Sequence, residues 1–163
     1  RAVPPSEAPS GASTLVGCPQ LTGEYNLGSV VRSSAALGAG ALALGPRCCD
    51  PLSRRALKVS MGAAFRLPLL RLEEEAADLG RLRAAGFRVV GASPAPEALP
   101  LDAWRRRGPV ALVLGEEAEG LPEPWASGCD ALLRIPMRAG SDSLNVSVAA
   151  GILLHALLSQ PGD

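Results

Sequence analysis

Polar residues that could do chemistry gather in three segments of an otherwise aliphatic sequence. The first is residues 26–40, NLGSVVRSSAALGAG. Asn26 is suited to capping a helix start, and Gly28 lets a ligand or another backbone approach the first turn. Arg32 then falls among apolar residues, where a guanidinium is costly unless it meets an anion. The segment therefore suggests an anion-binding helix, although a surface arginine on a polar stripe explains Arg32 equally well.

The second segment is residues 112–122, LVLGEEAEGLP, in which an apolar strand runs into an acidic turn. Ligand sites in α/β proteins lie just past the carboxyl ends of strands. Gly115 and Gly120 permit tight turns that expose backbone amides, and Glu117 could hold a cationic or hydroxyl group. An ordinary solvent-exposed acidic loop is the alternative interpretation.

The third segment is residues 134–155, RIPMRAGSDSLNVSVAAGILLH, which combines a strand end, a loop of small residues and an apolar helix. Capping of that helix explains Ser143. It does not explain Asn145 inside an apolar first turn, nor a loop that leaves amide donors free at a helix N-terminus. This segment is therefore a third candidate for part of a site.

Short aliphatic runs alternate with helical stretches around these segments. Strands are expected at residues 14–17, 40–44, 88–91, 110–114 and 131–135. Helices are expected at residues 27–38, 52–60, 73–86 and 143–159. Strands separated by helices predict an α/β domain with a mostly parallel sheet and helices on both faces. The glycine-rich run 37–45 follows a helix and precedes a strand, the wrong order for a dinucleotide-binding turn, which disfavours a dehydrogenase.

The last expected helix is apolar around nearly its whole circumference. A helix that is apolar on all sides must be buried on all sides. In a small domain, a terminal helix reaches that state most easily by packing on another subunit as well as on its own sheet. We therefore hypothesise an oligomer; a helix wedged centrally within one chain is the alternative.

Composition sets limits on the class of protein. Of 163 residues, 47% are hydrophobic and 20% charged, which excludes a disordered chain. Apolar runs stay well short of the ~20 residues of a membrane span, and no signal sequence opens the chain, so we expect a cytoplasmic protein without a membrane partner. Sixteen basic and sixteen acidic residues cancel, so binding to a nucleic acid would need a local patch or a partner. Only 3% of residues are aromatic, which argues against base stacking on Phe or Tyr.

The sequence divides into a short N-terminal segment and one longer folded region. Residues 1–13 are rich in Pro, Ser and Gly and are expected to be a linker, and the opening Arg1 suggests that an upstream region was removed. Residues 14–160 are expected to form one folded domain. The four cysteines form no C-x-x-C pair, so we expect buried, reduced thiols and no metal site.

Taken together and in this order, the three segments resemble the three motifs of the SpoU/TrmH family of RNA ribose 2′-O-methyltransferases, within the SPOUT superfamily. Motif one is an asparagine, a glycine and an arginine on one helix. Motif two is a Leu-Gly-x-Glu-x-x-Gly-Leu turn, and motif three is Ile-Pro-Met followed by Ser-Leu-Asn-Val-Ser; the match spans residues 14–159. There are two departures: Ala118 stands where the family usually has glycine, and Glu116 where a small or amide residue is common.

The resemblance implies a C-terminal trefoil knot, a homodimer with active sites at its interface, and S-adenosyl-L-methionine as the methyl donor. The implied reaction-centre residues are Asn26, Arg32, Glu117, Ser143 and Asn145. The implied cofactor contacts are Gly115, Gly120, Ile135, Met137 and Leu144. The implied reaction is methyl transfer to a ribose 2′-hydroxyl of structured RNA, with ribosomal RNA favoured over transfer RNA and no metal required.

The family's proposed mechanism would make Arg32 the base. Because a guanidinium stays protonated in proteins, we favour Arg32 as the group that grips the target phosphate and orients the hydroxyl, with Glu117 holding either Arg32 or the cofactor side. RNA contacts are expected at Arg47, Arg54, Arg55 and Arg66. The run 105–107 of three arginines is equally well explained as a solvated helix end. The alternative function is a cofactor-dead RNA-binding or scaffolding dimer of the same fold, for which Ala118 is an argument.

Overall fold

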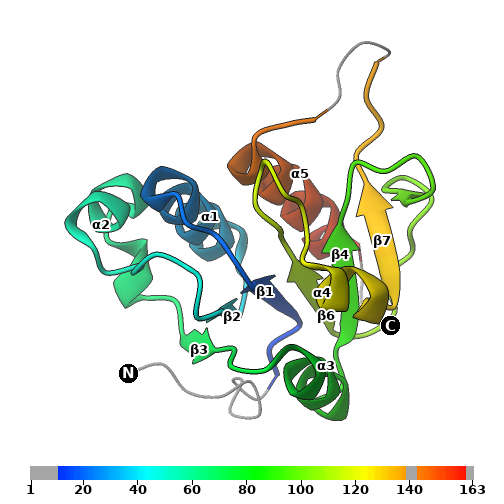
Figure 1. Ribbon diagram of the computed structural model, residues 1–163, viewed down its shortest axis with the longest axis horizontal. Helices are drawn as coiled ribbons and strands as arrows, with labels where there is room; N and C mark the ends of the chain where they lie inside the picture. The colour runs from blue at the N-terminus through cyan, green and yellow to red at the C-terminus, as the bar shows by residue number, and fades with distance from the viewer. Residues whose placement is uncertain (1–10, 139–142, 161–163) are drawn as a thin grey trace.

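Seven parallel strands form one sheet in the part of the chain that the computed structural model describes, residues 11–138 and 143–160 (Figure 1). Their order across the sheet is β3-β2-β1-β6-β4-β7-β5. The strands are β1 (Thr14–Cys18), β2 (Ala41–Leu44), β3 (Leu69–Arg71), β4 (Arg88–Ala92), β5 (Leu99–Pro100), β6 (Val110–Val113) and β7 (Ala131–Arg134). The predicted parallel α/β fold is confirmed.

The two central strands are buried along their whole length. β1 pairs with β2 and β6 in register, with Leu15 opposite Ala41 and Thr14 opposite Val110. Every residue of β1 and β6 is buried, which is why their sequences are continuous apolar runs rather than alternating ones. Such strands need helices on both faces of the sheet.

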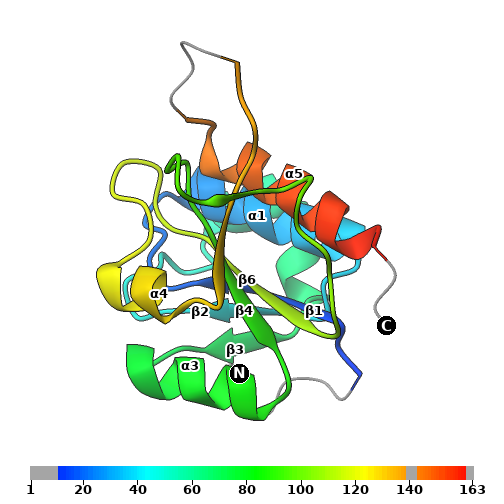
Figure 2. The same cartoon turned by 90° about the vertical axis from the view of Figure 1, so that its right-hand side faces the viewer.

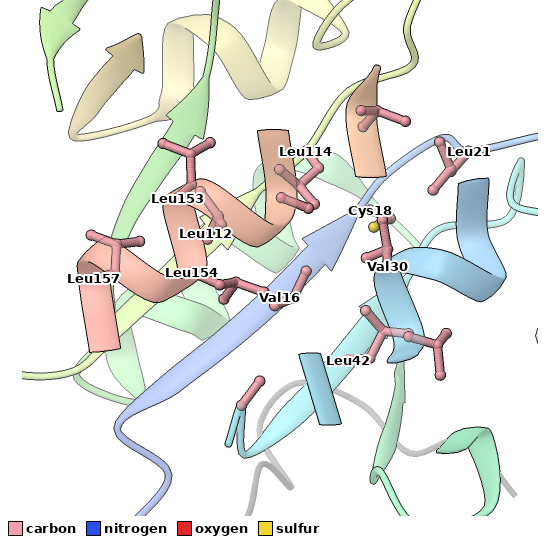
Figure 3. Close-up of a cluster of buried hydrophobic side chains, with 14 of the residues drawn as sticks. Val16, Cys18, Leu21, Val30, Leu42, Leu112, Leu114, Leu153, Leu154 and Leu157 are labelled. Atoms are coloured by element: carbon pink, nitrogen blue, oxygen red, sulfur yellow. The ribbon is translucent and has the colours of Figure 1, made fainter. Parts of the chain in front are cut away.

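Helices cover both faces (Figure 2). One face carries α1 (Glu24–Leu37), α2 (Arg54–Ser60), the 3₁₀ turn η2 (Ala63–Phe65) and α5 (Val146–Leu158). The other carries α3 (Glu75–Ala84) and α4 (Glu123–Gly128). Figure 3 shows the first core, in which leucines of α5 face Val16 of β1 and Leu112 of β6.

The Asp78 carboxylate closes the first turn of α3 by accepting from the Glu73 and Glu74 amides.

Four short elements were not predicted from the sequence. β3 has three residues and β5 two, too few to show a strand period, and β5 contains a proline. α4 has six residues with a proline near its start, and η2 has three. The longer expected strands and helices are all present. Short edge elements are specified by what they pack against rather than by their own sequence.

Two helix starts differ from expectation. Asn26 does not cap α1, which begins at Glu24 after an extended Gly23. The expected helix 143–159 begins only at Val146, and Asn145 is its N-cap rather than a residue of its first turn. Asn26 thus lies inside a helix rather than at its cap, and Asn145 lies at a cap rather than inside a helix.

Helix α5 is not wedged within the chain. Val146, Ala150, Leu153, Leu154 and Leu157 are buried, whereas Val148 and Ile152, one turn apart, are 50% and 39% exposed. This outcome contradicts the central-wedge alternative. It leaves an apolar stripe on the outer face of α5.

Other expectations have mixed outcomes. No helix of the described residues combines the length and the apolarity needed to cross a membrane. Of the four free thiols, only Cys18 is buried, and Cys48, Cys49 and Cys129 are half-buried. The implied trefoil knot stays a prediction. Most of the expected linker, residues 1–10, lies outside the described residues, as do residues 139–142 of the loop before α5 and the last three residues.

Gly28 and Gly80 form a matched pair that tests helix packing. A side-chain carbon at Gly28 would lie 2.8 Å from the Ala56 carbonyl oxygen of α2, whereas one at Gly80 of α3 would meet nothing within 4 Å. We expect Gly28→Ala to lower the free energy of unfolding by about 1–3 kcal/mol and Gly80→Ala to raise it by about 0.5–1 kcal/mol. Denaturant unfolding measures both; equal effects would contradict the close approach of α1 and α2.

Candidate active site

A cleft of about 950 Å³ opens at the carboxyl ends of β4, β6 and β7. Its walls are the loops that follow these strands, residues 93–96, 114–121 and 135–138, together with residues 143–144 and the first turns of α5. The carboxyl edge of a parallel sheet is where such folds bind their ligands, because the following loops converge there. The cleft is therefore the first candidate for the site.

The loop after β6 closes tightly on itself. The Glu116 amide donates to the Gly120 carbonyl at 3.1 Å, and the Gly120 amide donates to the Glu116 carbonyl at 2.8 Å. A side-chain carbon at Gly115 would lie 2.1 Å from the Gly120 carbonyl carbon, and Gly120 has a φ of +71°. Both glycines are therefore required by the turn itself.

Ala118 does not disturb this loop. Met61 is the one non-glycine residue with positive φ among those the structure describes, so Ala118 lies in a backbone region that any residue adopts. Its side chain is exposed at the rim of the cleft. The departure from the family pattern thus costs this loop no backbone strain.

A polar network beside the cleft joins α1, the loop after β6 and the start of α5. The Asn145 Oδ1 caps α5 by accepting from the Ser147 amide at 3.0 Å and the Ser147 hydroxyl at 2.6 Å. Its Nδ2 group then faces away from the helix, toward two acceptors. It donates to the Asn26 Oδ1 at 3.0 Å and to the Glu117 Oε2 at 2.9 Å. The Asn26 Nδ2 also lies 3.5 Å from the same carboxylate oxygen.

Glu116 fastens the same loop to the segment that precedes α1. Its carboxylate accepts from the Gln20 Nε2 at 3.1 Å, from the Thr22 amide at 3.1 Å and from the Thr22 hydroxyl. The Thr22 hydroxyl, helped by the Thr22 amide and Gln20, holds the pKa of Glu116 below its ordinary value. The second departure from the family pattern therefore links the loop after β6 to the start of α1, and both of these carry residues of the network.

Arg32 stands apart from the cleft and the network. It is exposed on α1 and makes no ion pair or hydrogen bond within the described part of the chain. The desolvation cost expected for an arginine among apolar residues therefore does not arise. Of the two alternatives expected for Glu117, Arg32 forms no hydrogen bond or ion pair with it; the carboxylate is bound by asparagines and lines the cleft.

All five residues expected to contact a cofactor line the cleft. They are Gly115, Gly120, Ile135, Met137 and Leu144. Glu117 and Ser143 of the expected reaction centre also line it, whereas Asn26, Arg32 and Asn145 do not. The loop after β4, Ser93 to Pro96, was missed. Its Ser-Pro-Ala-Pro sequence directly after a buried strand is the signal that would have found it.

The four arginines expected to contact RNA are all exposed and lie outside the cleft. Arg47 follows β2 and lies 4.0 Å from the Glu75 carboxylate, while Arg54 and Arg55 begin α2. Arg66 follows η2 and comes before β3, toward the amino edge of the sheet.

The run 105–107 is not a solvated helix end. Arg106 is 7% exposed and donates to the carbonyls of Leu157, Gly108 and Ser13. It therefore holds the end of α5 to the start of β1.

Comparison with known proteins gives the family. The model of the SpoU rRNA Methylase family matches residues 13–155. The chain therefore belongs to the SpoU rRNA methylase family, as the three motifs indicated.

The relatives share this domain. The chain is 37% identical over 152 residues to an uncharacterized tRNA/rRNA methyltransferase of Mycobacterium bovis, covering 90% of this chain and 52% of that one. It is 35% identical over 147 residues to the 23S rRNA (guanosine-2′-O-)-methyltransferase RlmB of Acinetobacter baylyi, covering 90% and 59%. A crystal structure of an AdoMet-bound rRNA methyltransferase from Sinorhizobium meliloti superposes with a TM-score of 0.87 at 31% identity, covering 96% and 60%. The chain thus spans only about half to three fifths of the length of these relatives.

The Glu116 link predicts a pH dependence. Its lowered pKa means that the charged form is stabilised in the fold, so its contribution is present above the ordinary value of 4.5 and is lost as pH falls through the folded-state pKa. We expect Glu116→Gln to lower the free energy of unfolding by about 1 kcal/mol at pH 7, and the difference from wild type to shrink below pH 4.5. Glu97→Gln, at an exposed position, is the control and should show no such trend. A constant difference across pH would contradict the link.

Proposed function

We propose that the protein is an S-adenosyl-L-methionine-dependent RNA methyltransferase that methylates a ribose 2′-hydroxyl, with ribosomal RNA favoured over transfer RNA and the cytoplasm as its location. One observation carries the proposal: the cleft and the Asn26–Glu117–Asn145 network lie next to each other at the carboxyl edge of the sheet. The RlmB relative, whose name specifies a 2′-O-methyltransferase of 23S rRNA, supports the substrate class.

The cleft fits the proposed cofactor in size and chemistry. Its volume of about 950 Å³ lies in the range of small-molecule sites, and the leucine and isoleucine side chains in its walls suit an adenine ring. Backbone groups of the loop after β6 stand beside them, and the acidic residues of that loop suit a cationic ligand such as a sulfonium. When bound there, S-adenosyl-L-methionine would supply the methyl group.

The residues around the cleft have separate roles in this proposal. Glu117 and the two asparagines hold α1, the loop after β6 and α5 at a fixed separation, so that the target ribose meets a preorganised site. Ser143, exposed at the rim, is placed to donate to or accept from the substrate. The exposed Arg32 is free to grip a substrate phosphate, and because its guanidinium stays protonated we assign it positioning rather than proton removal.

A homodimer is part of the proposal. The exposed Val148 and Ile152 form an apolar stripe on α5, and α5 has no Asp, Glu, Lys or Arg. Burial of such a stripe against the same stripe of a second copy would give a two-fold interface. α1, which packs beside α5, exposes Tyr25 and Arg32 seven residues apart on one side, which would bring Arg32 near that interface.

Cofactor binding is the first test. Calorimetric titration with S-adenosyl-L-methionine should give saturable, micromolar binding. Gly115→Ala should weaken it more than about tenfold, because the added carbon collides with the Gly120 backbone and shifts the loop. Ala118→Gly is the matched control and should change it little, since Ala118 needs no left-handed φ. Absence of binding by wild type, with binding restored by Ala118→Gly, would instead favour the cofactor-dead scaffold.

Arg32 provides the second test. We expect Arg32→Ala to reduce methyl transfer to RNA by more than about a hundredfold while leaving cofactor affinity unchanged, because Arg32 lies outside the cleft. Tritium transfer from labelled cofactor to ribosomal RNA measures the first quantity and calorimetry the second. Arg107→Gln removes an exposed arginine elsewhere and should retain activity. Retained transfer in Arg32→Ala would rule out a role for this residue.

A further inference from the structure

The two most exposed large hydrophobic side chains of the described residues lie close together in sequence. Met61 is 70% and Phe65 72% exposed, whereas the other phenylalanine, Phe87, is 6% exposed. Exposed Arg54, Arg55, Lys58 and Arg66 flank them. We call these six residues the α2–η2 surface. An exposed phenylalanine in a chain with so few aromatics indicates a surface that something else covers.

The charge around this surface has one sign. Residues 51–71 contain five basic residues and no acidic one, in a chain whose net charge is zero. Arg71 lies 3.5 Å from the Glu73 carboxylate, but no ion pair is found for the other four within the described part of the chain. The preceding acid, Asp50, accepts from the Leu52 amide. The surface is thus a local cationic patch of the kind that a neutral chain needs to hold a polyanion.

A tight turn joins the helix that carries three of the cations to the 3₁₀ turn that carries the aromatic ring. Arg55 and Lys58 are three residues apart on the exposed side of α2, whose buried side is Ala56 and Ser60. Met61 caps the helix in a left-handed conformation with φ of 53°, and Gly62 follows with φ of +73°. This double turn carries the chain from the exposed face of α2 directly into η2.

The turn that carries the exposed Phe65 ring is held in position. A side-chain carbon at Gly62 would lie 3.9 Å from the Phe65 Cδ2, so the ring lies near the turn. The backbone amide of Phe65 donates to the Gly62 carbonyl at 3.1 Å. The two residues before it, Ala63 and Ala64, are 2% and 4% exposed and fix η2 to the core. A ring fixed on a rigid turn loses little conformational entropy when a planar ligand stacks on it.

We propose that the α2–η2 surface binds an unpaired segment of the RNA substrate, with a base stacked on Phe65 and phosphates bound by Arg54, Arg55, Lys58 and Arg66. The proposal rests on the proposed function and adds to it the kind of RNA that is bound. Bases present a flat apolar face between phosphates, which matches an aromatic ring among cations. The uncharged stripe of α5 suits a second copy of the chain instead, because there like charges do not meet.

The experiment measures binding of a fluorescein-labelled, unstructured oligoribonucleotide of about 12 nucleotides, within the reach of a single-strand site. Phe65→Ala should weaken binding about tenfold, the effect of losing one stacked base, and Phe65→Trp should restore it. An abasic strand of the same length should bind wild type and Phe65→Ala equally. Retained binding of S-adenosyl-L-methionine by each variant shows that it is folded and that its cleft is intact.

Charge variants separate phosphate contacts from stacking. Arg54→Gln and Arg55→Gln should each reduce the slope of log affinity against log salt by about 0.7, the value for one phosphate contact on a single strand. Arg107→Gln, which removes an exposed arginine of the segment before β6, outside the α2–η2 surface, should leave the slope unchanged.

Two results would overturn the proposal. One is unchanged RNA affinity in Phe65→Ala. The other is loss of dimerisation in that variant, measured by sedimentation equilibrium, together with a fall in RNA affinity no larger than the fall in the fraction of dimer. That result would make this surface a subunit interface. The proposed function fails separately: wild type that binds RNA through Phe65 but not S-adenosyl-L-methionine would uphold the surface and reject the methyltransferase.

Discussion

The site depends on a single side-chain amide that is used at both of its ends. The Asn145 Oδ1 satisfies a free amide at the start of α5, which fixes the direction of the side chain. Its Nδ2 must then point away from the helix, and both of its hydrogens find acceptors, on Asn26 and on Glu117. A requirement of helix capping thereby positions two residues that are 119 and 28 positions away in sequence. Serine or aspartate would cap equally well but would offer no such donor pair.

The sequence was sufficient to predict the fold and several residues of the cleft, but not where the helices begin. The alternation of short aliphatic strands with helical stretches was sufficient to predict a parallel α/β fold, and all five cofactor residues implied by the motifs line one cleft. The helix starts were wrong by up to three residues, because Asn26 and Asn145 both have good capping propensity, yet Asn26 lies inside α1 and only Asn145 caps a helix. Capping propensity is a property of a single residue and does not by itself decide where a helix begins.

Composition describes the chain as a whole and does not locate single side chains. An aromatic content of 3% argued against base stacking, yet Phe65 stands exposed among cations. An average over the chain does not show that one particular ring is exposed, and η2, with only three residues, is too short for a periodic pattern. The same limit applies to Arg106: three successive arginines suggest a solvated run, but a turn directs the middle one inward to three carbonyls. In both places backbone geometry, not residue type, decides which side chain meets solvent.

Helix α1 brings these features together because it uses each of its sides for a different contact. Gly28 lets α2 approach closely, so α2 packs firmly against the helix that carries motif one. The cations of α2 lie on its other, exposed side. Asn26 faces the network at the cleft, and α5 packs along another side. Tyr25 and Arg32 remain exposed. A substrate that spanned from the α2–η2 surface to the cleft would therefore cross α1, and Arg32 is a cation exposed on that helix. The glycine of motif one is thus a packing requirement that sets the distance between the α2–η2 surface and the helix that borders the cleft, rather than a point of ligand approach.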